Sequence, residues 1–177
     1  MNRTPKPTVK AIIREKLGHF REVPIPHEKA VQFAAGMEFT TRLSRTIKSA
    51  CSSFGIQNHA ELADGLAKRS ETRIANLVAG KEKPLTESEY IRRSINVRDA
   101  IYIKRLPDGR REELESSLAE LYRRNGPVWS TIINMEYDIL LEIRGMRIIP
   151  DGKFVQFAKH FLRAFYDSRG AIILQNQ

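Results

Sequence analysis

The residues from Gly55 to Pro84, GIQNHAELADGLAKRSETRIANLVAGKEKP, have the pattern of two short helices joined by a tight basic turn. Asn58 followed by Glu61 has the spacing of a capping box, in which each side chain bonds a free backbone N–H at the first turn of a helix. This pair predicts that the first of the two helices begins at His59.

The second helix of this segment is predicted from about residue 71 to residue 79. Ser70 offers an N-cap for it, after Lys68 and Arg69 interrupt the apolar pattern of the first helix. Gly80 is suited to end the helix in a left-handed conformation. Its apolar side has the spacing of a buried stripe, with Ile74, Leu77 and Val78. We therefore expect a helix-turn-helix whose second helix keeps one polar face.

That polar face carries side chains of the kinds that read base edges. Arg bonds guanine and Asn bonds adenine, each through two hydrogen bonds, in the major groove of duplex DNA. The candidate base-reading residues, three and four positions apart on one side of the helix, are Thr72, Arg73 and Asn76. The candidate phosphate-contacting residues, which flank this helix or lie on an earlier one, are Lys68, Arg69, Lys81, Lys83, Arg42 and Arg45.

The same segment resembles a known family. The run Glu61-Leu62-Ala63, the pair Ser70-x-Thr72, the pair Ile74-x-x-Leu77, and Gly80-Lys81 before Pro84 resemble the helix-turn-helix of lambda-repressor-like (Cro/CI) regulators. A similar run occurs in the helix-turn-helix of ParB-like partition proteins. The resemblance implies a sequence-specific DNA-binding protein, a bacterial, phage or plasmid transcriptional regulator. The alternative is an ordinary helical hairpin with a solvated basic face.

The distribution of charge favours an anionic partner for the N-terminal part of the chain. The 177 residues include 30 Lys and Arg against 21 Asp and Glu, for a formal net charge of +9. Residues 1–111 hold 22 of the basic and 12 of the acidic side chains, so the remainder is nearly neutral. We expect double-stranded DNA as the partner, with RNA and an acidic protein bound by a basic helical adaptor as alternatives.

The overall pattern predicts a mainly α protein, a helical bundle that contains the helix-turn-helix and ends in a C-terminal helical association region. The predicted parts are a flexible basic arm at 1–8, the DNA-binding domain at 9–90 and the association region at 91–177. Helices in the N-terminal part are predicted at 9–20, 28–37 and 39–54. The Val23–Pro26 segment is expected to stop the first of them.

The segment from 86 to 111 is predicted to start as a helix after Thr86 and to be the most basic part of the chain. Its apolar alternation from 100 to 106 is compatible with a short β-hairpin near 100–111 or with the end of a long helix. The candidate secondary basic surface consists of Arg92, Arg93, Arg98, Lys104, Arg105, Arg110 and Arg111.

The C-terminal region is predicted to form helices at 112–124 and 128–144 and a last helix with an aromatic stripe. These apolar faces form either the core of one chain or a seam shared with a second copy. The candidate dimerisation residues are Trp129, Ile133, Phe157, Phe161 and Phe165. Because one short recognition helix reads few base pairs, we expect a homodimer on paired half-sites.

Motifs of catalytic chemistry are weak. The histidines lack metal-ligand spacing, and neither a phosphate-cradling glycine loop nor a nucleophile elbow is found. The run from His160 to Arg163 resembles the His-x-Leu-Arg box of tyrosine recombinases, but Tyr166 follows too closely to be that family's nucleophile. Cys51 is the one cysteine, expected to be a buried thiol, with a redox switch as the alternative. We expect a cytoplasmic protein that is not an enzyme, without metal, cofactor, small-molecule ligand or membrane span.

Overall fold

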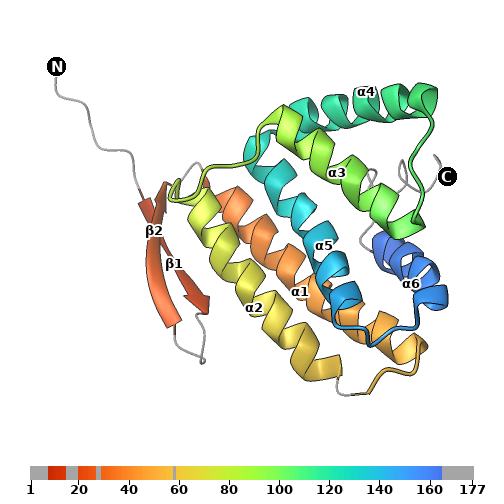
Figure 1. The fold of residues 1–177 in the computed structure, drawn as a ribbon. Helices are drawn as coiled ribbons and strands as arrows, with labels where there is room; N and C mark the ends of the chain where they lie inside the picture. The colour runs from red at the N-terminus through yellow and green to blue at the C-terminus, as the bar shows by residue number, and fades with distance from the viewer. Residues whose placement is uncertain (1–7, 15–19, 27–28, 58, 165–177) are drawn as a thin grey trace.

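The computed structural model describes residues 8–14, 20–26, 29–57 and 59–164, with side chains described for 29–57 and 59–162. In these residues the chain forms one small sheet and six α-helices (Figure 1). The elements are β1 (Thr8–Arg14), β2 (Phe20–Pro26), α1 (Ala30–Ser53), α2 (His59–Val78), α3 (Glu87–Tyr102), α4 (Asp108–Asn125), α5 (Pro127–Gly145) and α6 (Asp151–Ala164). The predicted mainly α-helical bundle is confirmed.

The N-terminal elements are strands, so the helix predicted at 9–20 is wrong. β1 and β2 pair antiparallel, from Thr8 opposite Pro26 to Arg14 opposite Phe20. Both strands of a two-stranded ribbon are edges, where a proline without an N–H is tolerated, and β-branched residues such as Ile12 and Ile13 suit a strand. The Val23–Pro26 segment therefore belongs to β2. The predicted arm at 1–8 lies outside the described residues except for Thr8.

α1 and α2 form an antiparallel pair in close contact. Gly36 of α1 faces Ile74 of α2, and a Cβ built on Gly36 would lie 2.5 Å from the Ile74 Cγ2 methyl. A glycine inside a helix costs about 1 kcal/mol relative to alanine, so its place here is explained by the close approach of the two helices. Leu43, Ile47 and Ala50 continue the buried side of α1.

Two breaks predicted within these helices do not exist. α1 is continuous from Ala30 to Ser53, and the hydroxyls of Thr40 and Thr41 both donate to the Met37 carbonyl within the helix. α2 is continuous from His59 to Val78, so the predicted turn at Lys68–Ser70 and a separate helix at 71–79 are wrong. The Ser70 hydroxyl, predicted to cap a new helix, donates back to the Leu66 carbonyl at 3.0 Å instead.

The ends of α2 agree with the sequence. The helix begins at His59 as predicted, although Asn58 lies outside the described residues. Gly80 adopts the left-handed conformation, with a φ of 79°. The Lys81 N–H then donates to the Asn76 carbonyl at 2.9 Å, which satisfies one of the free carbonyls at the end of the helix.

α3 and α4 form the upper corner of the bundle in Figure 1. Thr86 caps α3 as predicted, because its hydroxyl accepts the Glu89 N–H at 3.2 Å. α3 continues to Tyr102 and α4 begins at Asp108, so of the two structures considered for residues 100–111 the end of a helix is correct and the short β-hairpin is wrong. Ile103 ends α3 with a φ of 52°. A small apolar cluster between the two helices contains Tyr90, Ile95, Leu106, Leu114 and Leu118.

α5 runs through the middle of the bundle and carries the main core. It starts at Pro127 after Gly126 and ends at Gly145, close to the predicted bounds. It packs against α2 and α3, while α6 packs against α1 (Figure 1). The main cluster joins residues from Phe39 to Leu162, so the two predicted parts of the chain share one core.

Candidate nucleic-acid interface

Arg73, the strongest base-reading candidate, lies in a network of ion pairs that joins α2, α3 and α5. Its Nε lies 3.1 Å from Glu82 Oε1, and its Nη1 lies 3.4 Å from Asp138 Oδ2 on α5. Asp138 also pairs with Arg93 of α3. The Arg73 and Asp138 side chains are each 35% exposed, so this guanidinium is half-covered and already neutralised.

The other two base-reading candidates lie on the same half-covered face. The Thr72 hydroxyl donates to the Lys68 carbonyl at 3.3 Å. The Asn76 side chain is half-buried next to the loop that follows α2. Arg69, a phosphate-contact candidate, pairs with Glu142 of α5 at 2.5 Å. The face predicted to enter the major groove therefore packs beside α5 and is bridged to it by carboxylates.

Part of the candidate secondary basic surface lies at the α3–α4 connection, where Arg98 and Arg111 both pair with Asp99. Arg98 is 1% exposed, pairs with Asp99 at 2.9 Å and donates to the Lys104 carbonyl at 2.9 Å. Its burial excludes it from the surface, so its assignment is wrong. The carboxylate partners of the others are Asp99 for Arg111, Asp108 for Arg105, Glu113 for Arg110 and Asp138 for Arg93. Arg92 and Lys104 form no ion pair with any described side chain.

The cations left without an ion pair among the described side chains include Arg42 and Arg45 on α1 and Lys68, Lys81 and Lys83 around α2. Arg42 and Arg45 belong to an exposed line of side chains that we call the α1 ridge, composed of Glu38, Arg42, Arg45, Ser49 and Ser52. Its spacing of three and four residues keeps the line on one side of the helix. From Arg42 to Ser52 the ridge is about 15 Å long.

The two serines of the ridge were not among the predicted site residues. Ser49 and Ser52 are exposed hydroxyls in line with the two arginines. The signal in the sequence was the polar periodicity opposite the buried Leu43 and Ile47. The helix predicted at 39–54 already contained both serines, but only its arginines were considered as phosphate contacts.

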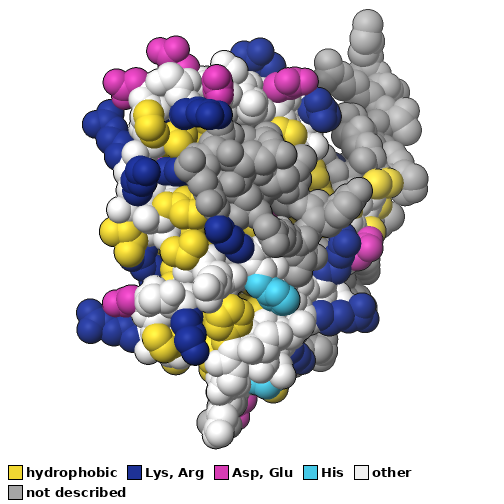
Figure 2. Space-filling model, turned by 90° about the vertical axis from the view of Figure 1, so that its right-hand side faces the viewer, with side chains coloured by type: hydrophobic (Ala, Val, Ile, Leu, Met, Phe, Trp, Pro, Cys, Tyr) yellow, Lys and Arg dark blue, Asp and Glu magenta, His cyan; other side chains and the backbone are white. Residues whose placement is uncertain are grey.

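On one face of the molecule (Figure 2), charge is dispersed. Figure 2 shows a face of the molecule on which Lys and Arg side chains are spread among apolar ones, while Asp and Glu gather mainly along the upper edge. Arg124 of α4 pairs with Glu120 of the same helix at 2.9 Å. Among the described residues visible on this face in Figure 2, the cations therefore form no continuous patch.

The candidate dimerisation residues divide into two groups. Phe157 and Phe161 are fully buried in the core of the single chain, next to each other and to Phe54, so their assignment to a dimer seam is wrong. Trp129 and Ile133 are half-buried on α5. Phe165 lies outside the described residues. The homodimer itself stays a prediction, which sedimentation of the protein with and without DNA would test.

Cys51 is buried among the core residues of α1, as expected. Burial raises the pKa of its thiol, because the thiolate would lose hydration in the core. Within the described residues, no group of three or more His, Cys, Asp and Glu side chains is placed to hold a metal ion. No helix of the described part combines the length and apolar composition of a membrane span.

Comparisons with known proteins found no match to a family model, to a curated protein or to a solved structure. The resemblance to Cro/CI and ParB-like proteins therefore stays a prediction, and arguments about function depend on the side chains of this chain alone.

Proposed function

We propose that the protein binds duplex DNA through the α1 ridge, which lies against the phosphate backbone. The observation that carries this proposal is the pair of exposed arginines, Arg42 and Arg45, which form no ion pair with the described side chains. Both were predicted to contact phosphate. The proposal keeps the partner that composition predicts and moves the contact from α2 to α1.

The chemistry of the ridge suits phosphate. Arginine and serine side chains are common phosphate ligands in protein–DNA complexes, and such contacts fix position without reading sequence. Arg42, Arg45, Ser49 and Ser52 offer donors along one straight helix. Phosphate contacts of this kind are available on both DNA and RNA duplexes, so competition between the two tests which one the ridge binds.

Equilibrium binding of a labelled DNA duplex at several salt concentrations tests the proposal. Replacing Arg42 or Arg45 with Gln should weaken binding and make the logarithmic salt slope shallower by about 0.9 for each lost phosphate contact. Arg92→Gln is the matched control, because Arg92 is also an exposed helical arginine without an ion pair among the described side chains but lies on α3. If the Arg42→Gln, Arg45→Gln double variant binds like the wild type, the proposal is wrong.

A separate measurement concerns sequence preference, on which the transcriptional role implied by the Cro/CI resemblance depends. Fragments selected from a random duplex library should be the same for wild type and for Arg73→Gln, because Arg73 is held by Glu82 and Asp138. A changed preference in this variant would support the original assignment to α2 and contradict the assignment to α1. An RNA duplex that competes as well as DNA would favour the RNA-binding alternative.

A further inference from the structure

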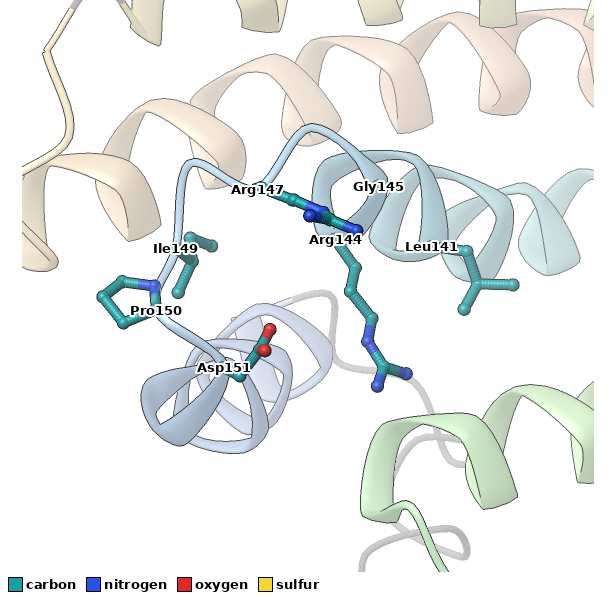
Figure 3. A pocket seen from close by; sticks show the side chains of 7 residues that line it. All are labelled: Leu141, Arg144, Gly145, Arg147, Ile149, Pro150 and Asp151. Carbon is teal, nitrogen blue, oxygen red and sulfur yellow. The ribbon is translucent and has the colours of Figure 1, made fainter.

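A pocket of about 620 Å³ lies where the loop between α5 and α6 folds over the start of α6. Its apolar lining comes from Leu141, Ile149 and Pro150, and its charged lining from Arg144, Arg147 and Asp151. Figure 3 shows Arg144 extending from α5 toward the end of α3, with Asp151 on the opposite side of the space. The volume lies within the range of small-molecule sites.

Arg144 is held in place by two contacts of different kinds. Its Nη1 donates to the Ala100 carbonyl of α3 at 2.5 Å. Its guanidinium carbon lies 5.4 Å from the centre of the Phe154 ring. A guanidinium has five N–H donors, so the bond to Ala100 leaves the others for a ligand. Because the group is already positioned, little side-chain freedom would be lost when it binds.

Arg147 follows directly after the end of α5 and lines the same pocket. Its φ of 55° is the left-handed conformation that commonly ends a helix, so glycine suits this position. In the part of the chain that the structure describes, no carboxylate forms an ion pair with Arg144 or Arg147, although Asp151 lines the same pocket.

We infer that this pocket binds a small organic anion, a phosphate monoester or a carboxylate with a compact apolar body. The oxyanion bonds Arg144 and Arg147, since arginine matches the planar geometry of such groups. The apolar body packs on Leu141 and Ile149. This site shares no residue with the α1 ridge and does not depend on DNA binding. Asp151 is the one acidic residue among those that line the pocket. Its negative charge repels an anion, so removing this charge by substitution should strengthen anion binding.

Amide NMR spectra of the full chain, at constant ionic strength set with chloride, test this assignment with phenyl phosphate, benzoate and inorganic phosphate as probes. Phenyl phosphate should give saturable shifts at Gly145, Arg147 and Asp151, and should bind about tenfold more tightly than inorganic phosphate because of the apolar lining. Binding of benzoate tests whether the site accepts a carboxylate group as well as a phosphate group. Shifts that do not saturate, or that spread over unrelated surface amides, would overturn the assignment.

Three variants separate a loss of anion binding from a loss of folding, because one of them is expected to bind more tightly. Arg144→Gln should weaken phenyl phosphate binding about tenfold or more. Arg147→Gly keeps a residue suited to the φ of 55°, so it should fold and still lose affinity. Asp151→Asn should tighten binding by about two- to fivefold. Arg92→Gln is the control, because Arg92 does not line the pocket and forms no ion pair with a described side chain; it should leave the affinity unchanged.

Two further outcomes would contradict the inference. Unchanged affinity in both Arg147→Gly and Asp151→Asn would show that the pocket charges do not contact the anion. Pocket shifts with a DNA duplex but none with the small anions would assign these arginines to nucleic acid instead. Failure of the DNA experiments on Arg42 and Arg45 leaves these measurements unaffected, because the probes contain no nucleic acid.

Discussion

Replacing Ile103 with glycine is expected to stabilise the protein, although it removes a large apolar side chain. Ile103 ends α3 with a φ of 52° and is 71% exposed. For an L-residue the left-handed conformation costs roughly 1–2 kcal/mol, and a β-branched residue is among the least suited to it. Glycine removes this cost but loses about 0.5–1 kcal/mol through the greater freedom of the unfolded chain.

The exposed position keeps the loss of packing small, so the net gain should be about 0.5–1 kcal/mol in the free energy of unfolding. For a chain of this length that corresponds to a rise in Tm of about 1–4 °C. Urea unfolding followed by far-ultraviolet circular dichroism measures the change. Ile103→Ala is the matched control, because it removes the same contacts and keeps a residue that disfavours the left-handed region. If the glycine variant is no more stable than the alanine variant, the backbone argument is wrong.

Three further outcomes are expected. Gly36→Ala should lower the free energy of unfolding by about 1–3 kcal/mol, because the new Cβ collides with Ile74; an unchanged urea midpoint would show that α1 and α2 are not so close. Cys51 should react with a thiol reagent near neutral pH much more slowly in the folded than in the unfolded protein, and equal rates would argue against its burial. Because burial raises the pKa of folded Cys51, its contribution to stability is present below the unfolded pKa and is lost as pH rises through the folded pKa. Asp138→Asn should cost about 1 kcal/mol or less, because its partners are half-exposed, and this cost should shrink with added salt; a loss independent of salt would contradict a mainly electrostatic role.

Apolar periodicity and terminal residues predicted the helices well where both signals agreed. Gly126 and Pro127 marked the start of α5, and Gly80 marked the end of α2. The errors concern residues with two competing local bonds. Ser70 and Thr40 are able either to cap a new helix or to donate to a carbonyl of the preceding turn, and their sequence neighbourhood does not distinguish the two. Packing of α2 along α5 favours the continuous helix.

The strands were missed for a related reason. The apolar residues of the segment from 8 to 14 fit either the helical or the strand period. The helix prediction did not consider that this segment pairs with residues 20–26. Pairing with β2, which contains Pro24 and Pro26, is visible only once the two segments lie opposite each other. Contacts between segments that are distant in sequence also explain why the ion pairs of Arg73 were not predicted. Asp138 neutralises Arg73 from 65 residues away, and no local pattern indicates that pairing.

Net charge alone therefore says little about how strongly this protein would hold a polyanion. A formal charge of +9 and 22 basic residues before residue 112 suggest a long salt-dependent contact. The structure assigns many of those cations to carboxylates, Arg98 among them inside the core. A cation already paired must lose its partner before it contacts phosphate, and this loss offsets the gain. If the α1 ridge is the contact, the salt slope should reflect about 2 phosphates bound by Arg42 and Arg45, or about 5 when Lys68, Lys81 and Lys83 around α2 also contact the DNA, each contributing about 0.9. A much steeper slope would mean that the ion pairs of Arg69, Arg73 and Arg93 open when DNA binds, and that the face between α2 and α5 takes part after all.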